Sequence, residues 1–190
     1  MTLASDRHCL DLADVSAIAS ATHRGVIKDE LVDLVDEDDN VVEVVTRAEM
    51  RARKGAVRHR SCYVAVLTSD DRLVVHRRAD WKEVYPGYWD ICFGGILGAG
   101  EAWDDAAQRE LLEEAGVEAE PVHVGTASWS APDTNLNARI YLARSDGPFT
   151  CPDGEVVEVT TIALDELDTW LAGREVCPDS VDLVVPHLPR

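Results

Sequence analysis

Residues 95–117, GILGAGEAWDDAAQRELLEEAGV, constrain this chain more than any other segment. Gly95 is followed after five residues by Glu101, and after seven more by the run RELLEEAGV. The stretch 103–115 contains neither glycine nor proline and is rich in Ala, Leu, Glu, Gln and Arg, which favours a helix. Gly116 is the residue type that most often follows a helix end in the left-handed conformation. The pattern therefore predicts a loop followed by a helix over 103–115.

The predicted helix carries two distinct faces. Glu110, Glu113 and Glu114 are spaced i, i+3 and i+4, so the three carboxylates share one face. Ala107 and Leu111 belong to a separate apolar stripe that faces the core. Exposed carboxylates this close repel each other by a few tenths of a kcal/mol per pair, on the order measured for helix pairs. A divalent cation would remove this repulsion, and oxygen ligands alone favour Mg²⁺ or Mn²⁺ over Zn²⁺.

The whole segment resembles the Nudix box, G-x5-E-x7-R-E-U-x-E-E-x-G-U, where U is apolar, and it does so without a gap. A solvated helix face would explain a lone E-x-x-E-E run, but not the further matches at Gly95, Glu101, Arg109 and Gly116. The resemblance implies an α/β fold, a Nudix-type α/β/α sandwich with a mixed sheet. It also implies metal-dependent hydrolysis of a diphosphate linked to another moiety, with Mg²⁺ (or Mn²⁺) as the cofactor.

The resemblance assigns roles to residues of the box. Glu110, Glu113 and Glu114 correspond to the carboxylates that hold the metal ions in the family. Gly95 corresponds to the loop glycine whose backbone carbonyl often joins them. Glu113 and Glu114 are also candidates for the catalytic carboxylate that takes a proton from the attacking water.

Two further sets of residues follow from the same resemblance. Arg109 and Glu101 correspond to the pair that orients the catalytic glutamates. In some relatives the base lies outside the box, and here Glu155 or Glu158, in GEVVEVTTIALDEL, could fill that role. The alternative is that these two glutamates belong to a solvated strand face, because they alternate imperfectly with the valines.

The region before the box resembles the Nudix branch related to isopentenyl-diphosphate isomerase. The matching features are VDEDDN, a TRAE helix start, HR before a core strand, RR at the end of the next strand, and YPGYWD. An isomerase-like enzyme is an alternative function, but Gly94 stands where isomerases have the catalytic cysteine. Cys92 is two residues too early, a shift of roughly 6 to 7 Å along a strand. A noncatalytic ligand-binding or sensor domain is the other alternative, and the intact box argues against it.

Candidate substrate-binding residues lie outside the box. Arginine side chains can form paired hydrogen bonds to phosphate, and tryptophan can stack on a base or cover an apolar tail. The alternative is that the basic residues are ordinary surface charges. The candidates are Arg58, Arg60, Arg77, Arg78, Trp81 and Glu158, with Lys82 as a further phosphate ligand. His59 and His76 are interpreted as structural.

Composition restricts the partners and the compartment. The net charge of −18 disfavours nucleic acid polymers and anionic membranes as partners, but a metal site allows a small-molecule diphosphate substrate. Five scattered cysteines without a C-x-x-C motif indicate reduced thiols. No secretory signal and no apolar run of membrane-spanning length is seen, so we expect a cytoplasmic protein.

The order of turn and strand patterns predicts the domain organisation. We expect an N-terminal extension at 1–27, a Nudix domain at 28–175, and a C-terminal tail or helix at 176–190. Strand patterns at 31–35 and 41–46, joined by the DEDDN turn, predict an N-terminal β-hairpin. A homodimer formed through the edges of this hairpin is left open. The other expected elements are a short basic helix at 48–54, strands at 61–67, 72–77, 120–130, 137–144 and 156–162, and helices at 165–172 and after residue 178.

Overall fold

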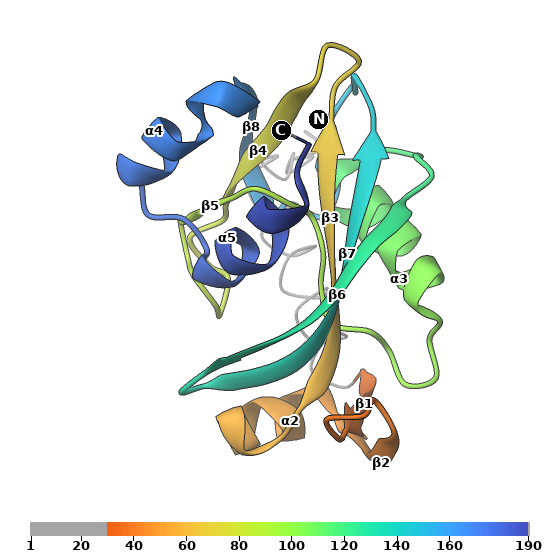
Figure 1. The fold of residues 1–190 in the computed structure, drawn as a ribbon. Coiled ribbons are helices and arrows are strands. Elements are labelled where there is room, and N and C mark those ends of the chain that lie inside the picture. The colour runs from red at the N-terminus through yellow and green to blue at the C-terminus, as the bar shows by residue number, and fades with distance from the viewer. Residues whose placement is uncertain (1–29, 190) are drawn as a thin grey trace, which may run out of the picture.

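The computed structural model describes residues 30–189, which form a sheet covered by helices on both faces (Figure 1). The predicted extension at 1–27 lies outside the described residues. The strands are β1 (Leu31–Val35), β2 (Val41–Thr46), β3 (His59–Leu67), β4 (Arg72–Arg78), β5 (Trp89–Asp90), β6 (Val122–Ala131), β7 (Thr134–Arg144) and β8 (Val156–Ala163). The helices are α2 (Arg47–Arg53), α3 (Trp103–Glu110), α4 (Leu167–Ala172) and α5 (Pro178–Val184). Short helical turns are η1 (Lys54–Ala56), η2 (Leu111–Ala115), η3 (Leu164–Glu166) and η4 (Val185–His187).

The eight-stranded sheet combines parallel and antiparallel pairs, as the sequence predicts. The central strand β3 runs parallel to β7 along its whole length, from the pair His59↔Leu136 to the pair Leu67↔Arg144. β4 pairs antiparallel with β5 and β8, and β6 extends the sheet beyond β7. The hairpin formed by β1 and β2 joins β3 at one end through Leu34↔His59.

Successive side chains of β3 enter two different cores, because neighbouring residues of a strand point to opposite faces. Cys62, Val64 and Val66 pack in the core that contains the buried residues of α3. Tyr63 and Ala65 pack in the core that contains the buried residues of α4 and α5. Figure 1 shows α3 on one side of the sheet and the pair α4 and α5 on the other. The predicted α/β/α sandwich is confirmed.

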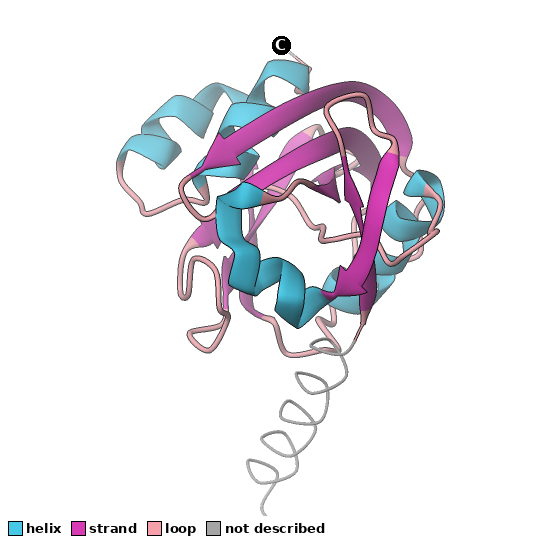
Figure 2. Ribbon diagram, turned by 90° about the horizontal axis from the view of Figure 1, so that it is seen from below, coloured by secondary structure: helices cyan, strands magenta, loops and turns pink. Residues whose placement is uncertain are grey.

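The N-terminal hairpin and α2 form a third, smaller unit at one end of the sheet, which is nearest the viewer in Figure 2. The carboxylate of Asp36 accepts the backbone N–H of Asn40 at 2.9 Å and closes the turn. The next helix begins with a capping box, in which Thr46 Oγ1 accepts the Glu49 N–H and Glu49 Oε2 accepts the Thr46 N–H. Met50, 3% exposed, anchors α2 on the hairpin core.

The box helix spans 103–115, as predicted, but its geometry changes along its length. α3 is α-helical, whereas Leu111–Ala115 widens into a π-helical turn. Such turns often occur at functional sites. Gly116 follows with φ of 69°, in the left-handed conformation that the sequence predicts for the helix end. Ala107 and Leu111 are buried, so the predicted apolar stripe does face the core.

Several element bounds differ from the sequence prediction by one to three residues. β3 begins at His59 rather than Ser61, because its pairing with β7 continues to that residue. The helix predicted after residue 178 is present as α5, and its Leu183 and Val184 are buried in the main core. Within residues 30–189, no helix has both the length and the apolar composition required to span a bilayer.

Candidate active site

The loop of Gly94 and Gly95 lies directly against the box helix. The backbone N–H of Gly94 donates a hydrogen bond to Glu114 Oε2 at 3.1 Å. A Cβ atom on Gly95 would lie 2.8 Å from the Cδ atom of Glu110, well inside normal carbon–carbon contact. Any side chain at this position would therefore displace the Glu110 carboxylate that it contacts.

Arg109 connects three glutamates of the site. Its Nε and Nη2 atoms donate to the two carboxylate oxygens of Glu101 at 2.8 and 2.9 Å. Its Nη1 atom donates to Glu110 Oε1 at 2.8 Å and to Glu113 Oε2 at 3.0 Å. Glu101 also accepts the backbone N–H of Gly98 at 2.8 Å. This geometry suits the positioning role that the sequence comparison predicted for Arg109 and Glu101, because paired guanidinium–carboxylate bonds fix both groups.

The three box glutamates differ in exposure. Glu110 and Glu114 are 7% and 4% exposed, whereas the Glu113 side chain is 46% exposed. Burial and the neighbouring Glu114 carboxylate raise the pKa of Glu110, and Arg109 opposes this shift. Two buried carboxylates that interact unfavourably are an arrangement that a bound cation stabilises. The donor set therefore fits a hard divalent ion.

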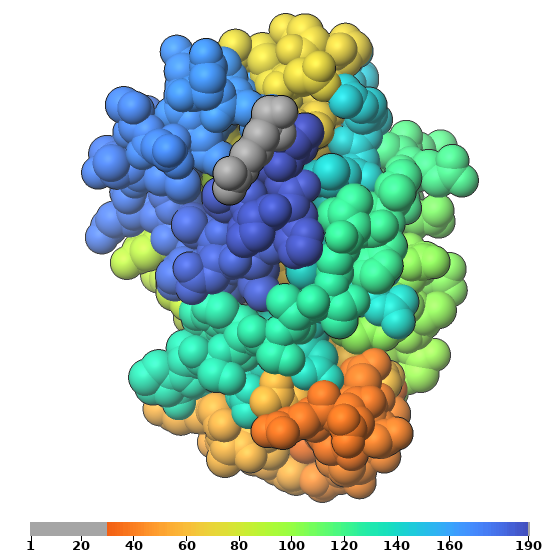
Figure 3. Space-filling model, viewed as in Figure 1, coloured from red at the N-terminus to blue at the C-terminus, as the bar shows by residue number. Residues whose placement is uncertain are grey.

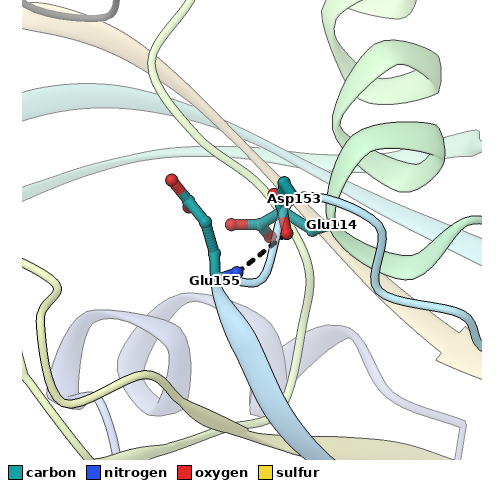
Figure 4. A group of neighbouring side chains, drawn as sticks. All are labelled: Glu114, Asp153 and Glu155. Carbon is teal, nitrogen blue, oxygen red and sulfur yellow. Dashed lines mark hydrogen bonds between the residues drawn. The ribbon is translucent and has the colours of Figure 1, made fainter. Parts of the chain in front are cut away.

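A second acidic segment meets the box helix at the start of β8. One carboxylate oxygen each from Glu114, Asp153 and Glu155 lies within 4.8 Å of the others, as Figure 4 illustrates. Lys82 forms an ion pair with Glu155, and its Nζ atom lies 3.7 Å from Glu114 Oε1. The sequence analysis named Glu155 as a candidate base but did not single out Asp153. This group of carboxylates could hold a metal ion.

A cleft of about 800 Å³ opens beside this acidic group and includes Gly94 and Glu155 in its lining. The basic residues of the cleft are Arg47, Arg51, Lys54, Arg78 and Lys82. Its aromatic residues are Tyr63, Trp81, Tyr85 and Trp129. The tip of the β6–β7 hairpin closes one side, and the space-filling view shows this green segment resting on the orange N-terminal unit (Figure 3). We call the part of the cleft beside Glu155 its acidic end and the part beside α2 its basic end; Glu83, Asp90, Asp133 and Asp179 also line the cleft.

The base of the cleft is also polar. Asp90 lies 3.6 Å from Arg78 through Oδ2 and Nη1, and its other oxygen accepts the Cys92 thiol at 3.5 Å. Tyr63 donates its hydroxyl to Asp179 Oδ2 at 2.9 Å. Burial raises the pKa of Asp90 to about 6, against the opposing effect of Arg78. Burial also raises the pKa of Cys92, which leaves this thiol protonated at neutral pH.

The structure separates the six substrate-binding candidates of the sequence analysis. Arg78 and Trp81 line the cleft. The other four candidates are not among its lining residues, and each has a partner elsewhere: Arg58 donates to Leu136 O and Asn137, Arg60 pairs with Asp33 and Asp39, and Arg77 pairs with Asp80 and Glu158.

Strand geometry explains much of this separation. On β3, His59 and Ser61 line the cleft, so Arg60 between them points to the opposite face. The sequence predictions did not include Arg47 and Arg51, although their i, i+4 spacing in TRAEMR places them on one helix face. That spacing was the available signal.

Comparison with known proteins indicates the same family as the resemblance of residues 95–117 to the Nudix box. The model of the NUDIX domain matches residues 57–179. An uncharacterized Nudix hydrolase of Pseudomonas aeruginosa is 34% identical over 167 residues, which cover 87% of this chain and 98% of the relative. The Nudix hydrolase YfcD of Escherichia coli K12 is 30% identical over 168 residues, covering 88% of this chain and 91% of the relative.

A solved structure supports the same conclusion at the level of the fold. The crystal structure of DR0079 from Deinococcus radiodurans superposes with a TM-score of 0.71 at 25% identity, covering 85% of this chain and all of the other. The family model, the relatives named as hydrolases and the intact box agree. This chain therefore belongs to the Nudix family of hydrolases.

Proposed function

We propose that this protein is a Mg²⁺- or Mn²⁺-dependent hydrolase of a small nucleoside-diphosphate-linked or organic diphosphate substrate. The observation that carries the proposal is the position of the buried carboxylates Glu110 and Glu114 beside a cleft with basic and aromatic walls. The acidic end suits a metal ion, and the basic wall suits the phosphates of a substrate.

Glu110, Glu113 and Glu114 are the proposed metal-holding residues, with Asp153 and Glu155 contributing from the start of β8. A bound divalent ion would neutralise the diphosphate and lower the pKa of a water molecule. Arg109 and Glu101 keep the helix carboxylates in place.

The Gly95 carbonyl is the weakest member of the proposed ligand set. Its oxygen accepts hydrogen bonds from the Cys62 N–H and the Ser61 hydroxyl, both at 3.0 Å. A carbonyl oxygen has two lone pairs. Ligation by Gly95 therefore requires the Ser61 hydroxyl to turn away.

We assign removal of the proton from the attacking water to Glu155. Within the group formed by Glu114, Asp153 and Glu155, it is the member that lines the cleft. Glu114 accepts the Gly94 N–H and faces the loop. Glu158, the other candidate outside the box, is not a lining residue and pairs with Arg77 at 3.7 Å.

The proposal is tested by phosphate release from a panel of nucleoside triphosphates, NADH, ADP-ribose, nucleotide sugars and isopentenyl diphosphate. Alkaline phosphatase converts monophosphate products into detectable phosphate. Glu114→Gln is the inactive control, and Glu118→Gln, at an exposed position on the other side of Gly116, is the matched control. Metal-dependent release that Glu114→Gln abolishes and Glu118→Gln retains supports hydrolysis.

Two other outcomes would overturn the proposal. Conversion of isopentenyl diphosphate to its isomer without phosphate release would indicate an isomerase, despite the glycine at position 94. Binding of a panel compound without any conversion would indicate a sensor domain.

A further inference from the structure

The basic end of the cleft is built around α2, which has no part in the Nudix box. Arg47 and Arg51 lie one helical turn apart and both line the cleft. The capping box at Thr46 and the buried Met50 fix the helix on the hairpin core. The two guanidinium groups are therefore held on a rigid element and directed to a common space.

Several positively charged side chains gather in this region, and their charges act on one another. Burial, followed by the charge of Arg47, lowers the pKa of Arg51, and Glu83 opposes this shift. Burial also lowers the pKa of Lys82, Glu114 opposes this shift, and Arg78 adds to it. These cations are close enough to repel one another in a protein whose net charge is −18. An anion in the cleft would relieve that repulsion.

The partners of the cations distinguish Arg51 from the others. Arg47 pairs with Glu30 at 3.0 Å, and Arg78 lies 3.6 Å from Asp90. Lys82 pairs with Glu155 at the acidic end. Among residues 30–189, the Arg51 guanidinium has neither a hydrogen bond nor an ion pair. Within the described part of the chain, its five N–H donors therefore have no acceptor.

The imidazole of His59 does not add to the positive charge of the basic end. His59 lines the cleft beside α2. Burial, then the charges of Arg51 and Arg47, lower its pKa to about 3. The imidazole is therefore neutral at physiological pH, and the arginines supply the positive charge that an anion meets there.

We infer that Arg47 and Arg51 form a subsite for a terminal phosphate group of the substrate. A terminal phosphate has three free oxygens and a charge near −2 at neutral pH, and it can accept paired bonds from two guanidinium groups. A phosphate that is esterified on both sides has fewer free oxygens and less charge. The subsite therefore selects compounds that end in a phosphate, such as nucleoside di- or triphosphates, over bridged compounds such as nucleotide sugars.

This inference rests on the proposed function for its identification of the ligand as substrate, but its test does not require turnover. Methylenediphosphonate is a suitable probe, because it has two terminal phosphonate groups and a bridge that resists hydrolysis. Its affinity is measured by calorimetry for the wild-type protein and for Arg51→Gln. The matched control is Arg53→Gln, which removes the same charge from α2 but affects an arginine paired with Glu43 outside the cleft.

We expect Arg51→Gln to weaken binding by about tenfold or more, as for the loss of a charge-assisted hydrogen bond, and Arg53→Gln to leave it unchanged. Equal affinities in all three proteins, or no binding by the wild type, would overturn the inference. With an active substrate that ends in a phosphate, Arg51→Gln should raise KM more than it lowers kcat. A bridged substrate should show no such change.

Failure of the two proposals gives different results. If the phosphonate binds through Arg51 but the whole panel resists hydrolysis, the hydrolase assignment fails and the anion subsite stands. If hydrolysis is metal-dependent but insensitive to Arg51→Gln for every substrate, the subsite is wrong and the hydrolase assignment stands.

Discussion

The two ends of the cleft are constructed in opposite ways. The acidic end comes mainly from one continuous segment, residues 95–117, whose members are linked to each other through Arg109. The basic end collects Arg47 and Arg51 from α2 with Arg78 from the end of β4. A continuous segment with fixed spacing can be identified in a sequence. A group that depends on how separate elements pack cannot be identified in that way.

The largest effect should come from the acidic end. We expect Glu113→Gln and Glu114→Gln each to lower turnover by roughly 10²- to 10⁴-fold, because each substitution removes a carboxylate charge from the proposed metal site. Each substitution changes the side-chain volume very little, so the fold should be retained. Circular dichroism should show an intact fold. Glu118→Gln should retain wild-type rates. Full activity in both box variants would contradict the assignment of this end as the catalytic one.

Gly95→Ala should have the next largest effect. The added methyl group meets the Glu110 carboxylate and must displace it. We expect turnover to fall by roughly 10- to 100-fold, the range seen when groups that orient metal ligands are changed. Gly98→Ala is the control, because a Cβ there would lie 3.6 Å or more from its neighbours. Similar activity for the two alanine variants would show that the close approach has no catalytic importance.

Arg109→Lys tests whether the acidic end depends on the shape of the guanidinium as well as its charge. A lysine cannot bond both oxygens of Glu101 and also reach Glu110 and Glu113. We expect turnover to fall by about tenfold or more. We also expect the free energy of unfolding to decrease by about 1 to 2 kcal/mol, measured by urea titration. A lysine variant with wild-type rate and stability would mean that charge alone suffices.

The last prediction concerns the stability of the fold rather than turnover, and it depends on the pH through Asp90. Burial raises the pKa of Asp90 from 3.8 to about 6. At pH values between these two, the folded state keeps a proton on Asp90 that the unfolded state has released. The stability of the wild type relative to Asp90→Asn should therefore fall as the pH rises from 4 to 6. Between pH 4 and pH 6 this difference in the free energy of unfolding changes by about 3 kcal/mol at most, and above pH 6 it stays constant.

Urea titrations of the two proteins at pH 4, 5, 6 and 7 measure this difference. Glu118→Gln serves as the reference for the general effect of losing one exposed acid. A stability difference between wild type and Asp90→Asn that does not change with pH would contradict the raised pKa. If the stability of the wild type relative to Asp90→Asn increased above pH 4, the pKa of Asp90 would be lowered rather than raised.

Local patterns predicted the fold well where the stabilising interactions are themselves local. The hairpin at 31–46 follows from alternation around a turn closed by Asp36, and the helix at 103–115 follows from composition and Gly116. The parallel pairing of β3 with β7 was not predicted, because it joins residues more than 70 positions apart. The sandwich itself was expected from the family resemblance.

The candidate site also has a part that depends on local sequence and a part that depends on how distant segments pack. The sequence identified Glu110, Glu114 and Arg109 as neighbours, since one helix holds them. It did not identify Asp153, whose position near Glu114 depends on where β8 begins. It favoured Arg60 because arginine binds phosphate, but strand alternation turns that side chain away from the cleft.

The most direct test of the account is the affinity for Mn²⁺, measured by calorimetry in the absence of substrate. Glu114 belongs to the box helix and also to the group formed with Asp153 and Glu155, so it should affect binding more than any exposed acid. We expect the wild type and Glu118→Gln to bind Mn²⁺ equally, and Glu114→Gln to bind at least about tenfold more weakly. Equal affinity in all three proteins would contradict the assignment of the acidic end as the metal site.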